Sequence, residues 1–398
     1  MSGPGDAASG GWLTEQDCRL DDFRAVVEQE TDLADYPLAD TVEQNVLVYG
    51  ARLAAHLADP AARRAVQAEL ARALLEGPGI VLFPRAFPDT DVVDRASAAF
   101  EALIAEQKAS GAVAGDHFAK PGANDRVWGA LDKLATRDPE VFADYYANDV
   151  VAAVSEAWLG PGYQVTSQVN VVNPGGAAQV AHRDYHLGFM SSGQARRFPA
   201  HVHRLSPALT LQGAVAHCDM PVETGPTRYL PHSQKYQAGY LAFHRPEFAE
   251  YFEANQVQPA LRKGDAAFFS PALFHAAGTN RSTGVRRMAN LLQVSSGFGR
   301  AMETVDRTAM CAALYPTLRR LTDSGADEGA LRNVVAAAAE GYSFPTNLDR
   351  DQPVGGMAPE TQAELVWRGL REGWDQATIL KELEAHRDRR TSPLRFGA

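Results

Sequence analysis

The spacing of apolar residues changes its period along the chain. Across residues 41–75 apolar residues return every three or four positions, which predicts helices with a break at Asp59-Pro60. The next run, Ile80–Phe83, is short and wholly apolar, which predicts a buried strand. Further helical patterns cover 90–107, 128–134 and 139–158. The first part of the chain is therefore predicted to be mainly helical.

From about residue 160 the pattern becomes that of short strands. The predicted strands are Tyr163–Val172, Ala178–His186, Ala208–Cys218, Thr227–Leu230, Ala266–His275 and Arg287–Val294. They lack the helical crossovers of a parallel sheet, which favours a sandwich or barrel. Helical periodicity then returns over 305–321, 328–339, 359–371 and 376–386. We therefore expect a mostly β core with flanking helices.

These patterns divide the chain into four regions. Residues 1–40 are expected to form a disordered or extended leader, and 41–159 a helical region that packs on the β core. Residues 160–300 are expected to form the catalytic core, and 301–398 a C-terminal helical extension.

Composition narrows the class of protein. The formal net charge of −11 argues against nucleic-acid binding, which needs a basic surface. No stretch approaches the roughly 18 consecutive apolar residues of a membrane-spanning helix. The three cysteines are widely spaced and form no CxxC motif, so neither a disulfide framework nor a thiolate zinc site is indicated. A cytoplasmic enzyme is expected, and the sequence leaves its oligomeric state open.

The clearest chemical signal is a His-x-Asp pair in the predicted strand 178–186. Residues two apart on a strand project to the same face, so His182 and Asp184 can bind one metal ion. A second histidine, His275, ends the apolar run that begins at Ala266. Two histidines and one carboxylate make a facial triad with open coordination positions, which suits non-haem Fe(II). The three residues are the candidate metal ligands and catalytic centre.

Two other interpretations remain open at this point. His186 shares the predicted face of His182 and Asp184, so His-x-Asp-x-His could hold zinc or two metals in a metallohydrolase. The denser His/Asp motifs typical of such hydrolases are absent. The chain could also be a non-catalytic, cupin-like metal-binding protein.

Several motifs in one order resemble the phytanoyl-CoA dioxygenase-like family of Fe(II)/2-oxoglutarate-dependent oxygenases. They are His182-Arg183-Asp184, the stretch Glu223–Ser233, Lys263-Gly264-Asp265, and then His275, Asn280 and Arg286. The stretch 223–233 departs slightly from the family pattern, since it ends in Pro231-His232-Ser233 where Gly-Ser-His is typical. This departure does not touch the candidate ligands.

The resemblance implies a double-stranded β-helix (jelly-roll, cupin-like) with iron at its mouth. It also implies 2-oxoglutarate as cosubstrate and O₂ as co-reactant, with oxidation of a small-molecule substrate and release of succinate and CO₂. The far carboxylate of 2-oxoglutarate is expected on Arg286, eleven residues after His275, while Arg287 should point to the opposite face. Because Asp184 supplies a carboxylate, hydroxylation or a related oxidation is favoured over halogenation.

Other polar residues are candidates for the rest of the site. Gln168 and Asn170 share a face of one predicted strand and could bind the cosubstrate, or could face water at a sheet edge. The candidate substrate-binding residues are His117, Lys120, Arg126, Tyr185 and His186. Their basic and aromatic character indicates a polar or anionic small molecule, and the sequence does not identify it.

Overall fold

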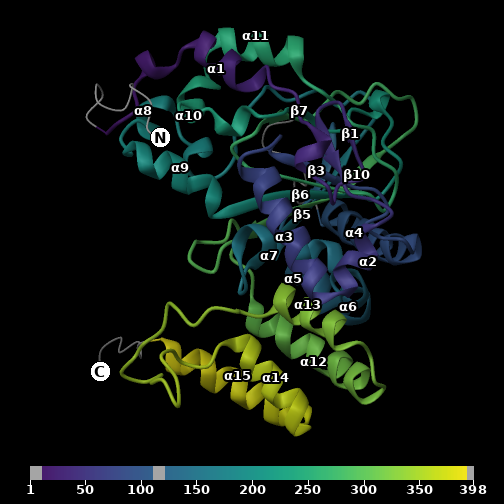
Figure 1. The fold of residues 1–398 in the computed structure, drawn as a ribbon. Coiled ribbons are helices and arrows are strands. Elements are labelled where there is room, and N and C mark those ends of the chain that lie inside the picture. Colours follow the sequence, from purple (N-terminus) through teal and green to yellow (C-terminus); the bar gives the residue numbers. More distant parts are fainter. Residues whose placement is uncertain (1–10, 111–121, 392–398) are drawn as a thin grey trace.

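Two β-sheets form the centre of the computed structural model, which describes residues 11–110 and 122–391 (Figure 1). The major sheet has eight strands in the order β1-β2-β3-β8-β6-β10-β5-β4, and all neighbours are antiparallel except β2 and β3. A minor sheet pairs β7 with β9. The strands are β1 (Thr41–Glu43), β2 (Val46–Val48), β3 (Ile80–Phe83), β4 (Asn124–Val127), β5 (Gln164–Val172), β6 (Thr210–Ala216), β7 (Arg228–Leu230), β8 (Ala266–Phe269), β9 (Phe274–Ala276) and β10 (Arg287–Ser295).

The two faces of the major sheet have different roles. On β10, Met288, Leu292 and Val294 belong to the large core shared with the helices. Alternate residues of a strand point to opposite faces, so Arg287 and Gln293 lie on the other face. The register of β10 against β5 and β6 assigns Gln168, Asn170 and Gln212 to that second face as well. We call it the triad face, because it is the side from which the candidate ligands are reached.

Helices surround this sheet. One group packs on the face opposite the triad and contributes most of the large core, and the C-terminal helices extend that core farther from the sheets (Figure 1). A second group, α1 and α8–α11, gathers around a separate apolar cluster with Phe274 of the minor sheet. The helices are α1 (Leu20–Val27), α2 (Leu53–Ala58), α3 (Pro60–Leu75), α4 (Thr90–Ala109), α5 (Ala130–Arg137), α6 (Pro139–Tyr146), α7 (Asp149–Leu159), α8 (Ser192–Ala195), α9 (Ala200–Ala208), α10 (Gly239–Ala242), α11 (Pro246–Asn255), α12 (Arg307–Asp323), α13 (Glu328–Ala338), α14 (Gln362–Glu372) and α15 (Gln376–Arg390). None of the described helices is both long and apolar enough to cross a membrane.

The expected mostly β core with flanking helices is confirmed. The two facing sheets give it jelly-roll character, although within 11–110 and 122–391 they do not close into a continuous barrel. The first 159 residues contribute more β structure than expected, because β1–β4 all belong to the major sheet. Residues 46–48 were expected in a helix, but all three are buried and β2 pairs with β3.

Three further segments differ from their predictions. The described part of the leader is folded, since α1 places Phe23 in an apolar cluster with no exposed surface. Residues 178–186 do not form a strand, and only an isolated bridge joins His182 to His275. The predicted strand 266–275 is divided into β8 and β9, because Pro271 lies in a turn between them.

Candidate active site

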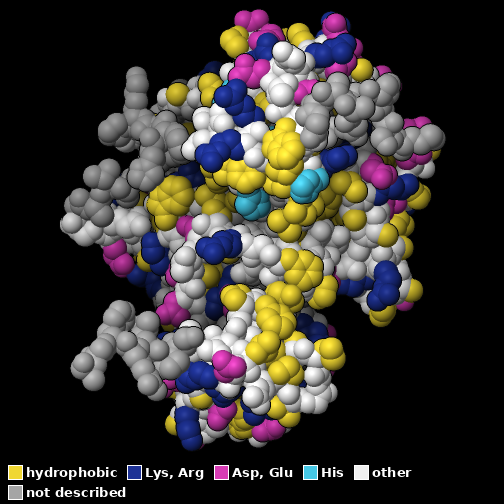
Figure 2. Space-filling view, turned by 90° about the vertical axis from the view of Figure 1, so that its left-hand side faces the viewer, with side chains coloured by type: hydrophobic (Ala, Val, Ile, Leu, Met, Phe, Trp, Pro, Cys, Tyr) yellow, Lys and Arg dark blue, Asp and Glu magenta, His cyan; other side chains and the backbone are white. Residues whose placement is uncertain are grey.

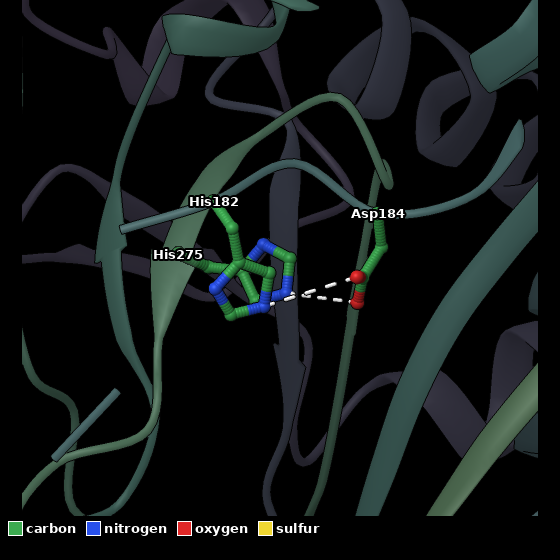
Figure 3. A group of neighbouring side chains, drawn as sticks. All are labelled: His182, Asp184 and His275. Atoms are coloured by element: carbon green, nitrogen blue, oxygen red, sulfur yellow. Dashed lines mark ion pairs between the residues drawn. The ribbon is translucent and has the colours of Figure 1, made fainter. Parts of the chain in front are cut away.

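The predicted triad comes together in space (Figure 3). The carboxylate of Asp184 lies 3.8 Å from Nε2 of His182 and 3.3 Å from Nε2 of His275. One ligand atom from each residue lies within 4.8 Å of the others. Two imidazole nitrogens and one carboxylate oxygen facing a common point fit the facial triad that holds non-haem Fe(II).

Each histidine is oriented by its second ring nitrogen. Nδ1 of His182 lies 2.8 Å from the carbonyl oxygen of Val180, and Nδ1 of His275 lies 2.9 Å from that of Leu273. A carbonyl can only accept, so Nδ1 carries the proton and Nε2 keeps its lone pair for a metal. Burial, together with the nearby His275, lowers the pKa of His182 and favours the neutral, ligating form.

The backbone brings the two ligand segments together without a continuous strand. The amide of His182 donates to the carbonyl of His275 at 3.0 Å, and the amide of His275 donates back at 3.1 Å. The amide of Asp184 donates to the carbonyl of Pro271 at 2.9 Å. These bonds place the His-x-Asp segment beside the β8–β9 turn.

Gln212, which the sequence did not single out, holds the carboxylate ligand. Its Nε2 donates to Oδ2 of Asp184 at 2.5 Å from the triad face of β6. Burial by itself would raise the pKa of Asp184, but the two imidazoles and this hydrogen bond outweigh burial and hold the pKa well below its usual range. Asp184 is therefore anionic at neutral pH, which is the form that can bind a metal ion. The alternation of β6 could have placed Gln212 on this face, but only the fold brings it to Asp184.

Arg286, the predicted cosubstrate residue, does not reach the triad face. Its guanidinium forms ion pairs with Glu101 of α4 at 2.8 Å and with Asp125 of β4 at 3.4 Å, and its side chain is 45% exposed. The pairing of β10 with β5 and β6 turns the side chain at position 286 toward α4. Counting eleven residues from His275 therefore selects an arginine on the opposite side of the sheet.

Arg287 occupies the triad face, and it is only 7% exposed. Its Nη1 makes two long contacts, to the carbonyl oxygens of Thr224 at 3.3 Å and Gly278 at 3.4 Å. Among the described residues it has no carboxylate partner. Burial lowers the pKa of Arg287 to about 10, which still leaves it charged at neutral pH. A buried, unpaired guanidinium is costly unless an anion joins it.

Gln168 and Asn170 also lie on the triad face. Gln168 accepts a hydrogen bond from Arg126 at 2.6 Å and donates to Gln293 at 3.2 Å. Asn170 lies opposite Ala289 in the ladder of β5 and β10, and its amide oxygen lies 3.5 Å from Nδ2 of Asn124. Neither side chain lies on an edge strand, since Arg126 and Asn124 belong to the neighbouring strand β4.

The predicted substrate-binding residues lie in different surroundings. Tyr185 follows Asp184 with a φ of 59°, and its buried hydroxyl has no hydrogen-bond partner among residues 11–110 and 122–391. His186 does not join the metal group, because its Nδ1 lies 3.0 Å from Oγ of Ser206. The His-x-Asp-x-His arrangement of a metallohydrolase is therefore not formed. His117 and Lys120 lie outside the described residues.

Comparisons with known proteins agree with this chemistry. A family model described as Phytanoyl-CoA dioxygenase (PhyH) matches residues 75–288, just over half of the chain. "Dioxygenase trt7" of Aspergillus terreus is 27% identical over 227 residues, which are 56% of this chain and 71% of that protein. "Dioxygenase andF" of Emericella variicolor is 30% identical over 139 residues, which are 34% of this chain and 43% of that protein.

Among solved structures, the epimerase SnoN in complex with Fe³⁺, alpha ketoglutarate and nogalamycin RO aligns with 60% of this chain and 85% of its own. Its sequence identity is 21% and its TM-score is 0.41. The family match runs from before β3 to the first two residues of β10 and includes all three candidate ligands, and it decides between the enzyme classes. The chain belongs to the phytanoyl-CoA dioxygenase (PhyH) family and is a non-haem Fe(II)- and 2-oxoglutarate-dependent dioxygenase.

Proposed function

We propose that this enzyme hydroxylates a small molecule with an apolar body, with release of succinate and CO₂ from 2-oxoglutarate. The observation that carries this proposal is the presence of two complementary groups on one side of the major sheet. They are an open metal triad and the buried cation of Arg287, which has no carboxylate partner among the described residues.

Each group has a distinct role in the proposal. His182, Asp184 and His275 would hold Fe(II), which supplies the oxidation chemistry with O₂ and 2-oxoglutarate when it is bound. Arg287, rather than Arg286, would bind the far carboxylate of 2-oxoglutarate, because a planar guanidinium pairs with a carboxylate through two hydrogen bonds. The carboxylate would replace the two long carbonyl contacts of Arg287 and neutralise its charge.

The substrate would lie on the exposed side of the triad, near Tyr185. Large apolar side chains near the site are exposed: Phe189 packs edge-on against the ring of Tyr185, and Val180 supplies the carbonyl that orients His182. Figure 2 shows histidine and apolar side chains together on one face of the molecule. The unpartnered hydroxyl of Tyr185 would bind a polar group of the substrate, while the apolar side chains would cover its hydrocarbon body.

Metal analysis tests the ligands directly. After reconstitution with Fe(II) in the absence of oxygen, the wild-type protein should hold one iron per chain, and His182→Ala and His275→Ala should hold almost none. His201→Ala is the control, because this exposed histidine lies outside the triad. Full iron occupancy in either triad variant would contradict the assignment.

Turnover tests the reaction. A panel of apolar small molecules should include some that raise succinate release above the level seen without substrate. The matching product should gain one oxygen atom by mass spectrometry. The hydroxylase proposal fails if iron and 2-oxoglutarate bind but 2-oxoglutarate is not consumed and no oxidised product forms. The ligand assignment would stand in that case.

A further inference from the structure

Arg183 lies between the two ligands of the His-x-Asp pair, and its side chain is directed away from the metal into the protein. It is 2% exposed and is among the largest fully buried side chains described. No described carboxylate forms an ion pair with it. A cation in such a place is costly to bury, so its retention points to a geometric task that an apolar side chain would not perform.

The guanidinium contacts other elements through hydrogen bonds and through aromatic rings. In the plane, Nη2 donates to the carbonyl oxygens of Ser233 at 2.5 Å and Tyr236 at 3.0 Å. Its Cζ also lies over two aromatic rings, 5.1 Å from the ring centre of Tyr240 and 5.2 Å from that of Phe274. The fixed fork of a guanidinium can donate to two carbonyl oxygens while it stacks on aromatic rings, which a compact ammonium does less well.

These contacts join the two halves of the triad. Phe274 directly precedes the ligand His275, and its amide donates to Oγ of Ser233 at 2.8 Å. On the other side, the hydroxyl of Tyr240 donates to the carbonyl oxygen of Asp184 at 3.3 Å. The Arg183 guanidinium therefore lies where the segment of His275 and the segment of Asp184 meet.

The surrounding backbone is shaped to this side chain. A Cβ atom at Gly239, the first residue of α10, would overlap the guanidinium carbon of Arg183. A Cβ atom at Gly188 would overlap its backbone carbonyl. The close approach of Gly239 leaves little freedom for the guanidinium to move, and the close approach of Gly188 restrains the backbone of Arg183.

We propose that Arg183 is a positioning residue that sets the distance between His275 and the His182–Asp184 pair, and so the affinity and geometry of the metal site. This inference rests on the proposed metal role of the triad. Arg183 touches neither the metal position nor the substrate side, and it acts through Phe274, Ser233 and Tyr240.

Co(II) is a suitable probe, because its visible absorption reports ligand geometry and its binding can be titrated without turnover. We would compare the wild type with Arg183→Lys, which keeps the charge and loses the planar fork, and with Arg183→Met, which keeps only the stem. The matched control is Arg307→Lys. Arg307 is likewise buried and donates to the carbonyl oxygens of Val165 and Ala337, but it lies in α12 on the opposite side of the major sheet.

We expect Co(II) affinity to fall at least tenfold in both Arg183 variants, with an altered absorption spectrum and a retained far-ultraviolet circular dichroism spectrum. Arg307→Lys should lower the melting temperature while its Co(II) affinity and spectrum stay those of the wild type. If the Met variant fails to fold, the Lys variant decides.

Three results would overturn the inference. The first is wild-type affinity and spectrum in the Arg183 variants, which would make the residue merely structural. The second is loss of folding in both Arg183 variants but not in Arg307→Lys. The third is an equal loss of Co(II) affinity in the control. Failure of the wild type to bind Co(II) would instead contradict the proposed metal site itself.

Discussion

Replacing each of two adjacent arginines separates the cosubstrate role from a surface role. The informative pair is Arg287→Met and Arg286→Met, since methionine keeps much of the apolar stem and removes the cation. Arg287 is 7% exposed and lies on the triad face, whereas the side chain of Arg286 is 45% exposed and paired with Glu101 and Asp125. Only Arg287 is placed to meet a bound dicarboxylate.

The expected magnitude follows from these surroundings. Losing one partner of a buried, hydrogen-bonded charge pair costs about 2–5 kcal/mol. The carbonyl contacts of Arg287, at 3.3 and 3.4 Å, are long, so little hydrogen bonding within the protein opposes the incoming carboxylate. We therefore expect a loss of about 3 kcal/mol, roughly a hundredfold in the Kd of 2-oxoglutarate. Exposed pairs such as that of Arg286 contribute about 0–1 kcal/mol, and to stability rather than to binding.

The assay is calorimetric titration of the Fe(II)-loaded protein in the absence of oxygen, first with 2-oxoglutarate and then with 2-oxobutyrate, which lacks the far carboxylate. The wild type and Arg286→Met should prefer 2-oxoglutarate strongly, and Arg287→Met should lose that preference. Without ligand, Arg287→Met should be at least as stable as the wild type, because it removes a buried cation that has no described carboxylate partner. Unchanged preference in Arg287→Met would refute this reasoning, and loss of preference in Arg286→Met alone would return the role to Arg286.

Three other predictions concern stability and metal affinity. Gln212→Leu should weaken Fe(II) binding about 10- to 100-fold, because Asp184 loses its hydrogen bond. Gln293→Leu, on the same face, is the control and should leave Fe(II) binding unchanged. Equal effects of the two substitutions would contradict the role of Gln212. Burial lowers the pKa of His217 to about 3, so below about pH 6.5 the unfolded chain binds a proton that the folded chain does not, and stability falls by about 2 kcal/mol by pH 5. Between pH 7 and pH 5, denaturant titrations should show that His217→Gln loses about 2 kcal/mol less stability than the wild type. An identical loss in the two proteins would argue against a neutral buried imidazole. Tyr185→Phe should keep or raise the melting temperature, since no described residue hydrogen-bonds to the hydroxyl of Tyr185. Tyr145→Phe loses hydrogen bonds to His217 and Asn290 and should lower the melting temperature. A clear drop for Tyr185→Phe would mean that its hydroxyl is hydrogen-bonded.

The elements with a strong period were predictable from the sequence. The alternation in β5, β6 and β10 and the helical spacing in α12–α15 were sufficient to place them within a few residues. β2 was missed because Val46 and Val48 form an all-buried strand, and its apolar run also fits a helix. Local period cannot show that a segment is buried on both faces by distant partners.

The triad was predicted from a shared strand face, but the spacing of its residues is what makes the prediction work. His182 and Asp184 were expected to share a face of a strand, yet their segment is irregular and takes its position from a bridge to His275. Spacing along the chain was enough to predict that the three side chains come together, because any extended segment brings residues two apart to similar directions. It was not enough to choose between Arg286 and Arg287, since that choice depends on the register of β10 against two neighbours.

The bridge between His182 and His275 has a consequence for the local stability of the protein with and without metal. Only two backbone hydrogen bonds join these residues, and within the described chain the longer ladders all lie elsewhere. A bound metal would add a third cross-link at the same point and draw the His-x-Asp segment onto the minor sheet. Amide hydrogen exchange in 178–186 should therefore slow sharply when metal is added, while exchange in β5 and β10 stays the same. Loss of the metal would loosen this segment, so limited proteolysis should cut 178–186 more readily in the metal-free protein than in the metal-loaded protein.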